Sequence, residues 1–153
     1  MEAGKIAGGW KGEKEGWTRV DCILDSGVSE SVCPLSMCSR YPISDSPGSI
    51  AGLQYTSANG GRIANRGQQR LPVELSNGTR SEALFQVADV TRPLVSVAAV
   101  CATGNVVIFG VGGGVIRNLE TGAETPFSRR DGVYIFQLWI PPPEAAPGFA
   151  GPP

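Results

Sequence analysis

The sequence predicts a mostly β domain built largely from hairpins. Apolar and polar residues alternate with the strand period of two in residues 20–24, 71–75 and 83–87. Turn sequences rich in Gly and Asn stand at 59–61, 77–78, 104–105, 112–114 and 131–132. Only residues 93–103 have the composition of a substantial helix. Together these observations favour a mainly antiparallel fold with one such helix.

Local signals place the ends of this helix and of the last strand. Thr91 can cap the helix, Pro93 is tolerated in its first turn, and Gly104 can end it. Residues 133–140 (VYIFQLWI) are apolar on nearly both faces, so a strand there needs cover on both sides. We expect a monomer of this size to have difficulty supplying that cover.

The length of 153 residues is suited to one domain. Before Trp17 the chain has glycines and lysines but little apolar surface to bury, and half of its 12 prolines lie beyond residue 140. The predicted organisation is a flexible N-terminal spacer at residues 1–16, a domain at 17–140 and a Pro/Gly-rich linker at 141–153.

Composition excludes several classes of function. The chain has no histidine, which removes Ser-His-Asp and Cys-His catalysis and histidine-ligated metals. A net charge of −1 offers no basic surface for nucleic acid. No apolar run reaches the roughly 20 residues of a membrane span, and the N-terminus lacks the apolar block of a signal peptide. We therefore expect a cytoplasmic protein that binds neither nucleic acid nor membrane.

Other local motifs have simpler interpretations than cofactor binding. The four cysteines lack a C-x2-C pair, so free buried thiols are favoured over zinc or disulfides. The glycine run 110–114 lacks a helix to receive a phosphate and is better explained as a hairpin. Asn77-Gly78 predicts a type I′ turn. No metal or other cofactor is expected.

The segment most informative about chemistry is residues 20–32 (VDCILDSGVSESV). An apolar strand leads directly into Asp25, and Ser26 and Gly27 follow. This order presents one carboxylate at the end of a rigid strand, and the glycine permits a tight turn that brings main-chain N–H groups near the acid. Asp-Ser-Gly by itself is also common in ordinary turns.

Three segments together resemble the retropepsins, the aspartic proteases of retroviruses and LTR retrotransposons. Residues 22–29 (CILDSGVS) resemble the active-site signature, 57–63 (SANGGRI) with Gly67 resemble the flap, and 85–97 (FQVADVTRPLVSV) resemble the stretch leading into the helix. The motifs occur in the family's order over about residues 18–110. This chain has Val28 where the family usually has Ala, Ser96 where it has Gly, and Ala98 where many members have Asp.

The resemblance implies a closed, antiparallel, barrel-like acid-protease domain that acts as a homodimer. Since Asp-Ser-Gly occurs once, each chain would supply one catalytic Asp25, with Ser26 bracing the pair and Gly27 at the active turn. Substrate binding would involve Val28 and the hairpin tip Asn59, Gly60 and Gly61, and residues 133–140 would help close the dimer. The expected substrate is an extended polypeptide, most simply the polyprotein carrying the domain.

Two alternatives to the protease remain. A retropepsin-like domain could dimerise or grip peptides without cutting them, and an unrelated β-domain could contain the same turn. Neither of these two alternative domains would show a cleavage activity that depends on Asp25.

Overall fold

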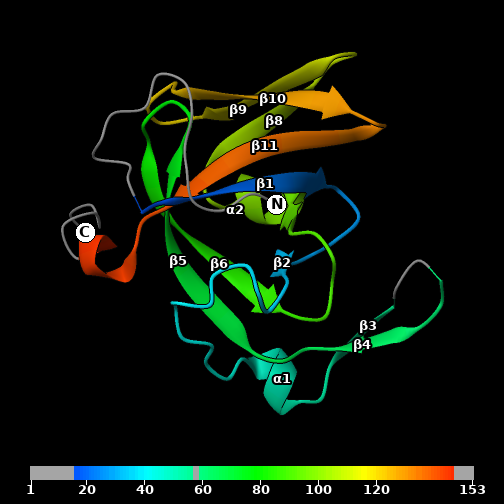
Figure 1. Ribbon diagram of the computed structural model, residues 1–153. Helices are drawn as coiled ribbons and strands as arrows, with labels where there is room; N and C mark the ends of the chain where they lie inside the picture. Colours follow the sequence, from blue (N-terminus) through cyan, green and yellow to red (C-terminus); the bar gives the residue numbers. More distant parts are fainter. Residues whose placement is uncertain (1–15, 57–58, 147–153) are drawn as a thin grey trace.

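The computed structural model describes residues 16–56 and 59–146, and β-strands dominate it (Figure 1). The strands are β1 (Thr18–Asp25), β2 (Val32–Cys33), β3 (Gln54–Thr56), β4 (Arg62–Ala64), β5 (Gln68–Leu75), β6 (Arg80–Val87), β7 (Leu94–Ser96), β8 (Asn105–Phe109), β9 (Gly113–Asn118), β10 (Glu124–Arg130) and β11 (Val133–Ile140). The helices are α1 (Pro47–Ile50) and α2 (Val97–Ala102), and a 3-10 turn, η2, covers Pro143–Ala145. The predicted mostly β class is confirmed.

Nine of these strands form one large mixed sheet. Its order is β1-β7-β2-β6-β5-β11-β10-β9-β8, and β1 also pairs with β11. The pairings from β1 through β7, β2, β6, β5 and β11 therefore return to β1. Most pairs are antiparallel as expected, but β1 pairs with β7 and β2 with β6 in parallel. The strand period does not encode this direction, which the connections between strands decide.

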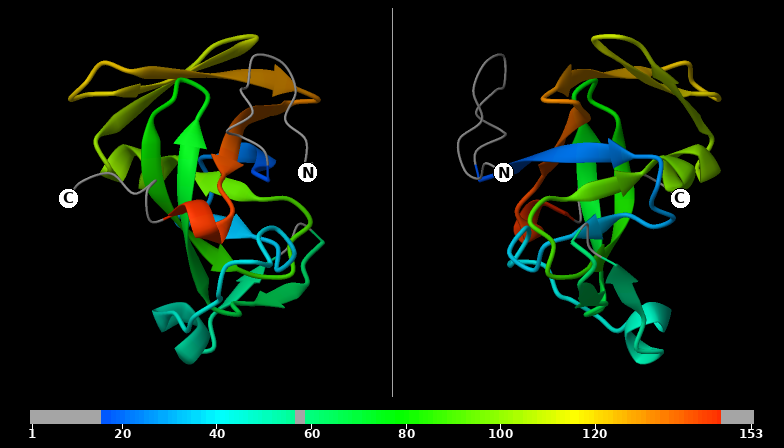
Figure 2. Two further views of the ribbon diagram at one scale, coloured as in Figure 1. Left: turned by 60° about the vertical axis from the view of Figure 1, so that its left-hand side comes forward. Right: turned by 90° about the vertical axis from the view of Figure 1, so that its right-hand side faces the viewer.

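A separate hairpin, β3–β4, projects from this sheet. Its register pairs Gln54 with Ala64 and Thr56 with Arg62. The hairpin and α1 lie at the opposite end of the molecule from β8, β9 and β10 (Figure 2). The hairpin predicted around residues 59–61 is thus confirmed.

The turns at residues 77–78 and 131–132 occur where they were predicted, but one of them is not of the predicted type. Asp131 and Gly132 both have positive φ, 53° and 82°, as a type I′ turn between β10 and β11 requires. At Asn77-Gly78 the type I′ prediction is wrong, because only Gly78 has positive φ. The loop between β5 and β6 is longer than a two-residue type I′ turn, because Leu75 N–H donates to Thr79 O. A loop of this length needs only one residue in the left-handed region.

The helix is shorter than predicted and begins later. Residues 94–96 continue as strand β7, and α2 covers only Val97–Ala102. Ser96, not Thr91, caps it by accepting a hydrogen bond from Ala99 N at 3.1 Å. Pro93 is buried ahead of β7. Parallel pairing of β7 with β1 holds this segment extended and overrides its helical composition.

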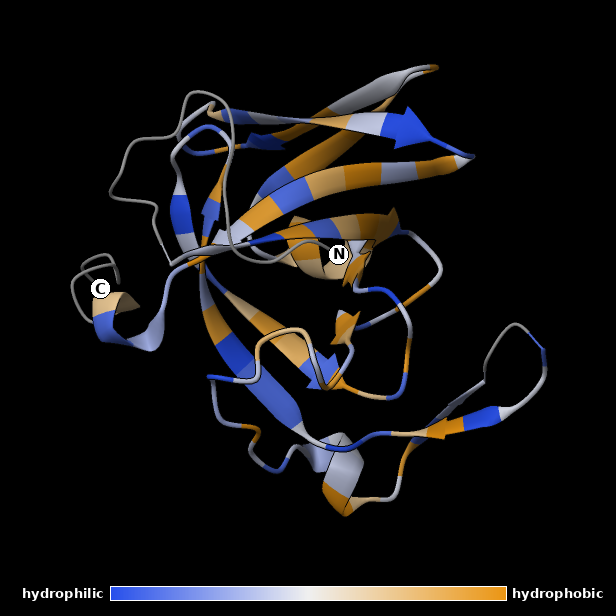
Figure 3. Ribbon diagram, viewed as in Figure 1, coloured by the Kyte–Doolittle hydropathy of each residue, from blue (hydrophilic) through white to orange (hydrophobic). Residues whose placement is uncertain are grey.

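Strand β11 lies inside the sheet of a single chain. It pairs with β1 along residues 134–140, and also with β10 and β5. Five of its side chains are buried: Ile135, Phe136, Leu138, Trp139 and Ile140. The expectation that one chain has difficulty covering this strand is therefore wrong. Neighbouring strands occupy both edges of β11, so it has no free edge for a second chain, and the role of residues 133–140 in closing a dimer stays a prediction. Figure 3 shows hydrophobic residues concentrated along β8, β11 and α2.

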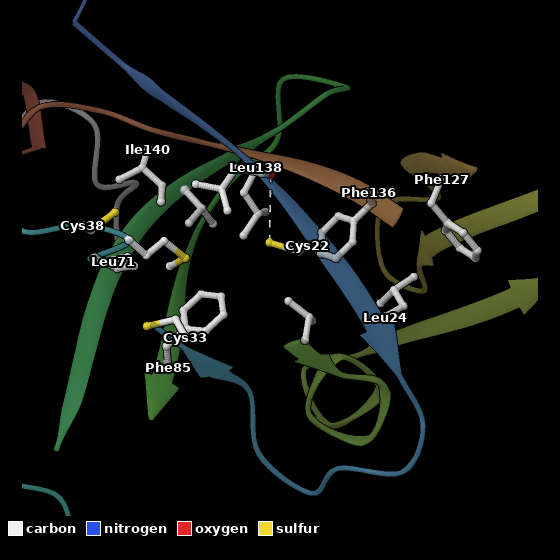
Figure 4. Packing of buried hydrophobic residues seen from close by; sticks show 14 of the residues in the cluster. Cys22, Leu24, Cys33, Cys38, Leu71, Phe85, Phe127, Phe136, Leu138 and Ile140 are labelled. Atoms are coloured by element: carbon white, nitrogen blue, oxygen red, sulfur yellow. Dashed lines mark hydrogen bonds between the residues drawn. The ribbon is translucent and has the colours of Figure 1, made fainter. Parts of the chain in front are cut away.

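The central core contains three of the four cysteines as free thiols. Cys22, Cys33 and Cys38 are buried and Cys101 is exposed, as Figure 4 shows for the buried three among Leu71, Phe85 and Leu138. Burial raises the pKa of the Cys33 and Cys38 thiols to about 12 and that of Cys22 further. The prediction of free thiols is confirmed, but the expected burial is wrong for Cys101, which lies exposed in α2.

The part of the predicted linker that the structure describes is packed against the domain. Pro141 is fully buried, and its carbonyl accepts a hydrogen bond from Tyr41 Oη at 2.6 Å. Arg40 and Glu144 form an exposed ion pair at 2.7 Å. The remainder, 147–153, and the predicted spacer up to residue 15 lie outside the described residues.

Thiol reactivity provides a test of this core. A thiol-disulfide reagent at pH 8 should react quickly with Cys101 alone, because the buried thiols stay protonated and the thiolate is the nucleophile. We expect one fast equivalent per native chain, none in Cys101→Ser, and all four on unfolding, measured by reagent absorbance. Two or more fast equivalents in the native protein would contradict the packing.

Candidate functional site

Asp25 is the last residue of β1 and lies where this central strand leaves the sheet. It pairs with Ser96 at the end of the parallel neighbour β7, while Leu24 pairs with Tyr134 of β11 on the other edge. Val20 and Cys22 point into the core and are fully buried. A strand held on both edges therefore fixes the backbone of Asp25, whose side chain is half-buried.

The turn after Asp25 directs a backbone N–H at its carboxylate. Gly27 N donates to Asp25 Oδ1 at 2.7 Å, the short distance typical of a hydrogen bond to a charged acceptor. A Cβ at position 27 would lie 3.2 Å from the same oxygen, so only glycine approaches this closely without a shift. Ser26 and Gly27 are exposed, and Val28 is half-buried. The structure thus brings together the four predicted residues 25–28.

Ser96 ties this turn to the helix. Its hydroxyl donates to Val28 O at 2.9 Å while it caps α2, and its N–H donates to Ser31 Oγ at 3.0 Å. Ser96 is fully buried, so these bonds are shielded from water. In the sequence, Ser96 stands out only as a difference from the retropepsins. A local signal for its capping role is nevertheless present, because a serine three residues before Ala99, at the start of an alanine-rich helix, is a typical N-cap.

The predicted hairpin tip is exposed. Asn59 Oδ1 accepts a hydrogen bond from Gly61 N at 3.0 Å, and Gly60 has a φ of +85°. The tip and the loop after Asp25 belong to different parts of the fold, the first to the projecting hairpin and the second to the large sheet (Figure 1).

Asn65 fastens the base of this hairpin to the sheet. Its Nδ2 donates to Tyr55 Oη at 3.0 Å and to Gln86 Oε1 at 2.9 Å. Its Oδ1 accepts from Ser46 Oγ at 3.2 Å and from Gly67 N at 2.8 Å. Both donors and both acceptor positions of the buried amide are used, which fixes its orientation.

Hydrogen bonds continue from Asn65 toward the turn after Asp25. Gln86 N donates to Ser31 O at 2.8 Å, and Ser31 Oγ accepts from Ser96, which bonds Val28. Burial raises the pKa of Tyr55, and the negative charge of Glu30 adds to the rise, against the lowering effect of the Asn65 hydrogen bond. A chain of hydrogen bonds through Gln86, Ser31 and Ser96 therefore connects the hairpin base to the site loop, and the sequence motifs gave no sign of this connection.

The described residues contain no group of three or more His, Cys, Asp or Glu arranged to hold a metal ion. In residues 16–56 and 59–146, no helix has the length and apolar character needed to cross a bilayer. The chain is therefore a mostly β domain that presents one carboxylate, Asp25, bonded by a backbone N–H. No family model matches the chain, and no curated protein or solved structure matches it either.

Replacing Asn65 tests its role at the hairpin base. Asn65→Leu should lower the free energy of unfolding by about 3 kcal/mol, since it leaves several buried polar groups unpaired. It should also speed amide hydrogen exchange in residues 54–64 more than in β10 and β11. The control is Asn77→Leu at an exposed turn, expected to cost about 1 kcal/mol or less. If the two variants lost the same free energy of unfolding, and amide exchange in residues 54–64 did not change in Asn65→Leu, this role of Asn65 would be contradicted.

Proposed function

We propose that this chain is an aspartic endopeptidase of the retropepsin-like class. The observation that carries the proposal is the Asp25 carboxylate at the end of a central strand, held by the N–H of Gly27 in an Asp-Ser-Gly turn. The cycle of strand pairings that returns to β1, and the short helix α2 directly after β7, support a barrel-like acid-protease domain. The resemblance of residues 22–29, 57–63 and 85–97 to the retropepsins points the same way.

The chemistry requires two carboxylates. Two adjacent carboxylates share one proton because like charges in contact cannot both ionise readily, and the aspartic proteases are the standard example of this effect. The ionised member takes a proton from the attacking water as general base, and the protonated member donates to the carbonyl oxygen. With one Asp-Ser-Gly per chain, the second Asp25 comes from a second copy.

Other residues have defined parts in this proposal. Ser26 braces the pair of carboxylates across the two-fold axis, and the backbone at Gly27 and Val28 receives the substrate main chain. The β3–β4 hairpin, with Asn59, Gly60 and Gly61 at its tip, closes over the peptide and excludes water. The substrate is an extended polypeptide, most simply a polyprotein containing this domain.

Cleavage by an Asp25→Asn variant tests this mechanism. The change keeps the side-chain shape but removes the ionisable group, so hydrolysis of a denatured protein substrate at mildly acidic pH should fall by about a thousandfold or more. Wild-type cleavage should also stop with an aspartic-protease inhibitor. Asp45→Asn, at an exposed acid outside the turn, is the matched control and should cleave normally. Retained activity in Asp25→Asn would refute the mechanism, and a wild type without activity would favour the non-cleaving module.

The homodimer needs a surface other than β11, and β8 is suited to it. β8 is at the end of the sheet order, paired only with β9, and Ile108 is 44% exposed. The end of β8 lies near the site: Tyr134, which pairs with Leu24, donates its hydroxyl to Gly110 O at 2.9 Å. In this proposal the second copy adds along this edge.

Dilution and a substitution at this edge test the dimer. Activity per chain should fall on dilution from micromolar to nanomolar, with the sedimentation coefficient changing over the same range. Ile108→Lys should move both transitions to higher concentration, because it places a charge in the apolar contact. Ile50→Lys, at an exposed isoleucine of α1, is the control. A monomer that cleaves equally well at every concentration would exclude the shared site.

A further inference from the structure

Strand β6 has a free edge along most of its length. Its neighbour β2 pairs with it only at Gln86 and Val87. Gln86 N donates to Ser31 O, away from β5, and the strand period of two points the main-chain groups of Leu84 and Glu82 to this same side. Within the part of the chain that the structure describes, no backbone hydrogen bond reaches Glu82 or Leu84 from that side.

A cavity of about 340 Å³ opens beside this edge. It lies between β6 and α2, with residues 29–31 at one end. Its walls are mainly apolar and include Leu84, Val100 and Phe136. The place where β2 would continue beside β6 is therefore open, next to a pocket large enough for an aliphatic side chain.

The charge around the cavity has one sign. Glu30 and Glu82 line it, and no lysine or arginine does. Arg70 lies 3.5 Å from Glu82, but both side chains are more than half exposed, so solvent screens this pair and leaves the carboxylate available to another cation. A ligand entering here would meet negative charge at the mouth and apolar surface inside.

We propose that the edge of β6 and this cavity form a second peptide-binding groove, distinct from Asp25. An extended peptide adds as a strand beside Glu82 and Leu84, exchanging main-chain hydrogen bonds with them. One aliphatic side chain enters the cavity, and a neighbouring lysine or arginine lies against Glu30 or Glu82. The groove does not depend on the proposed catalysis, since no step of peptide binding involves the Asp25 carboxylate.

The test uses the full chain carrying Asp25→Asn, so that the probe cannot be cleaved. The probe is a capped heptapeptide of alternating lysine and leucine, and its glutamate-leucine counterpart is the charge control. We expect saturable one-to-one binding of the lysine peptide, with NMR amide shifts in residues 81–86 and 99–103, and much weaker binding of the control. No binding, or shifts confined to residues 25–28 and the β3–β4 hairpin, would overturn the groove.

Three variants then separate the contributions. Leu84→Pro removes an edge N–H and should weaken binding about fivefold, whereas Leu84→Thr keeps it. Ala99→Leu partly fills the cavity and should weaken binding about tenfold. Glu82→Gln should weaken binding about threefold. If Leu84→Pro does not fold, the other two variants decide the question, and wild-type affinity in folded Ala99→Leu and Glu82→Gln would overturn the proposal.

Discussion

Strand β1 is paired on both edges, and this pairing holds the core and the site in place. β1 runs antiparallel to β11 from Thr18 to Leu24 and parallel to β7 from Ile23 to Asp25. Its inward side chains form the middle of the core. Because a strand with two paired edges has little freedom to move, the carboxylate at its end has a defined position before any ligand binds.

Buried polar side chains connect the segments that the sheet leaves irregular. Gln69 donates to the carbonyls of Cys38 and Tyr41, Asn65 joins the hairpin base to β6, and Ser96 joins α2 to the site turn. Each of these side chains is almost completely buried, so losing a hydrogen-bond partner would leave a buried polar group unpaired and lower the free energy of unfolding. Such bonds select one arrangement of the loops, whereas apolar packing alone tolerates several.

The two proposed interactions use different free edges of one sheet. β11 is interior, and the two edges used in these proposals are those of β8 and of residues 80–84 in β6. The first carries exposed apolar side chains and suits a second copy. The second borders an apolar cavity with acidic residues and suits a basic, extended peptide. Their different chemistry would keep self-association and peptide binding from competing.

Features that depend on residues close together along the chain could be predicted from the amino-acid sequence. Period-two alternation located β1, β5 and β6. Gly and Asn located turns, and the order of residues around Asp25 predicted a carboxylate at a strand end. Tertiary structure decided the interior position of β11, the parallel partner of β1, the late start of α2 and the joining of Asn65 to Gln86. Each of these rests on contacts between residues distant along the chain, and local patterns do not specify which strand edges and buried polar groups will meet.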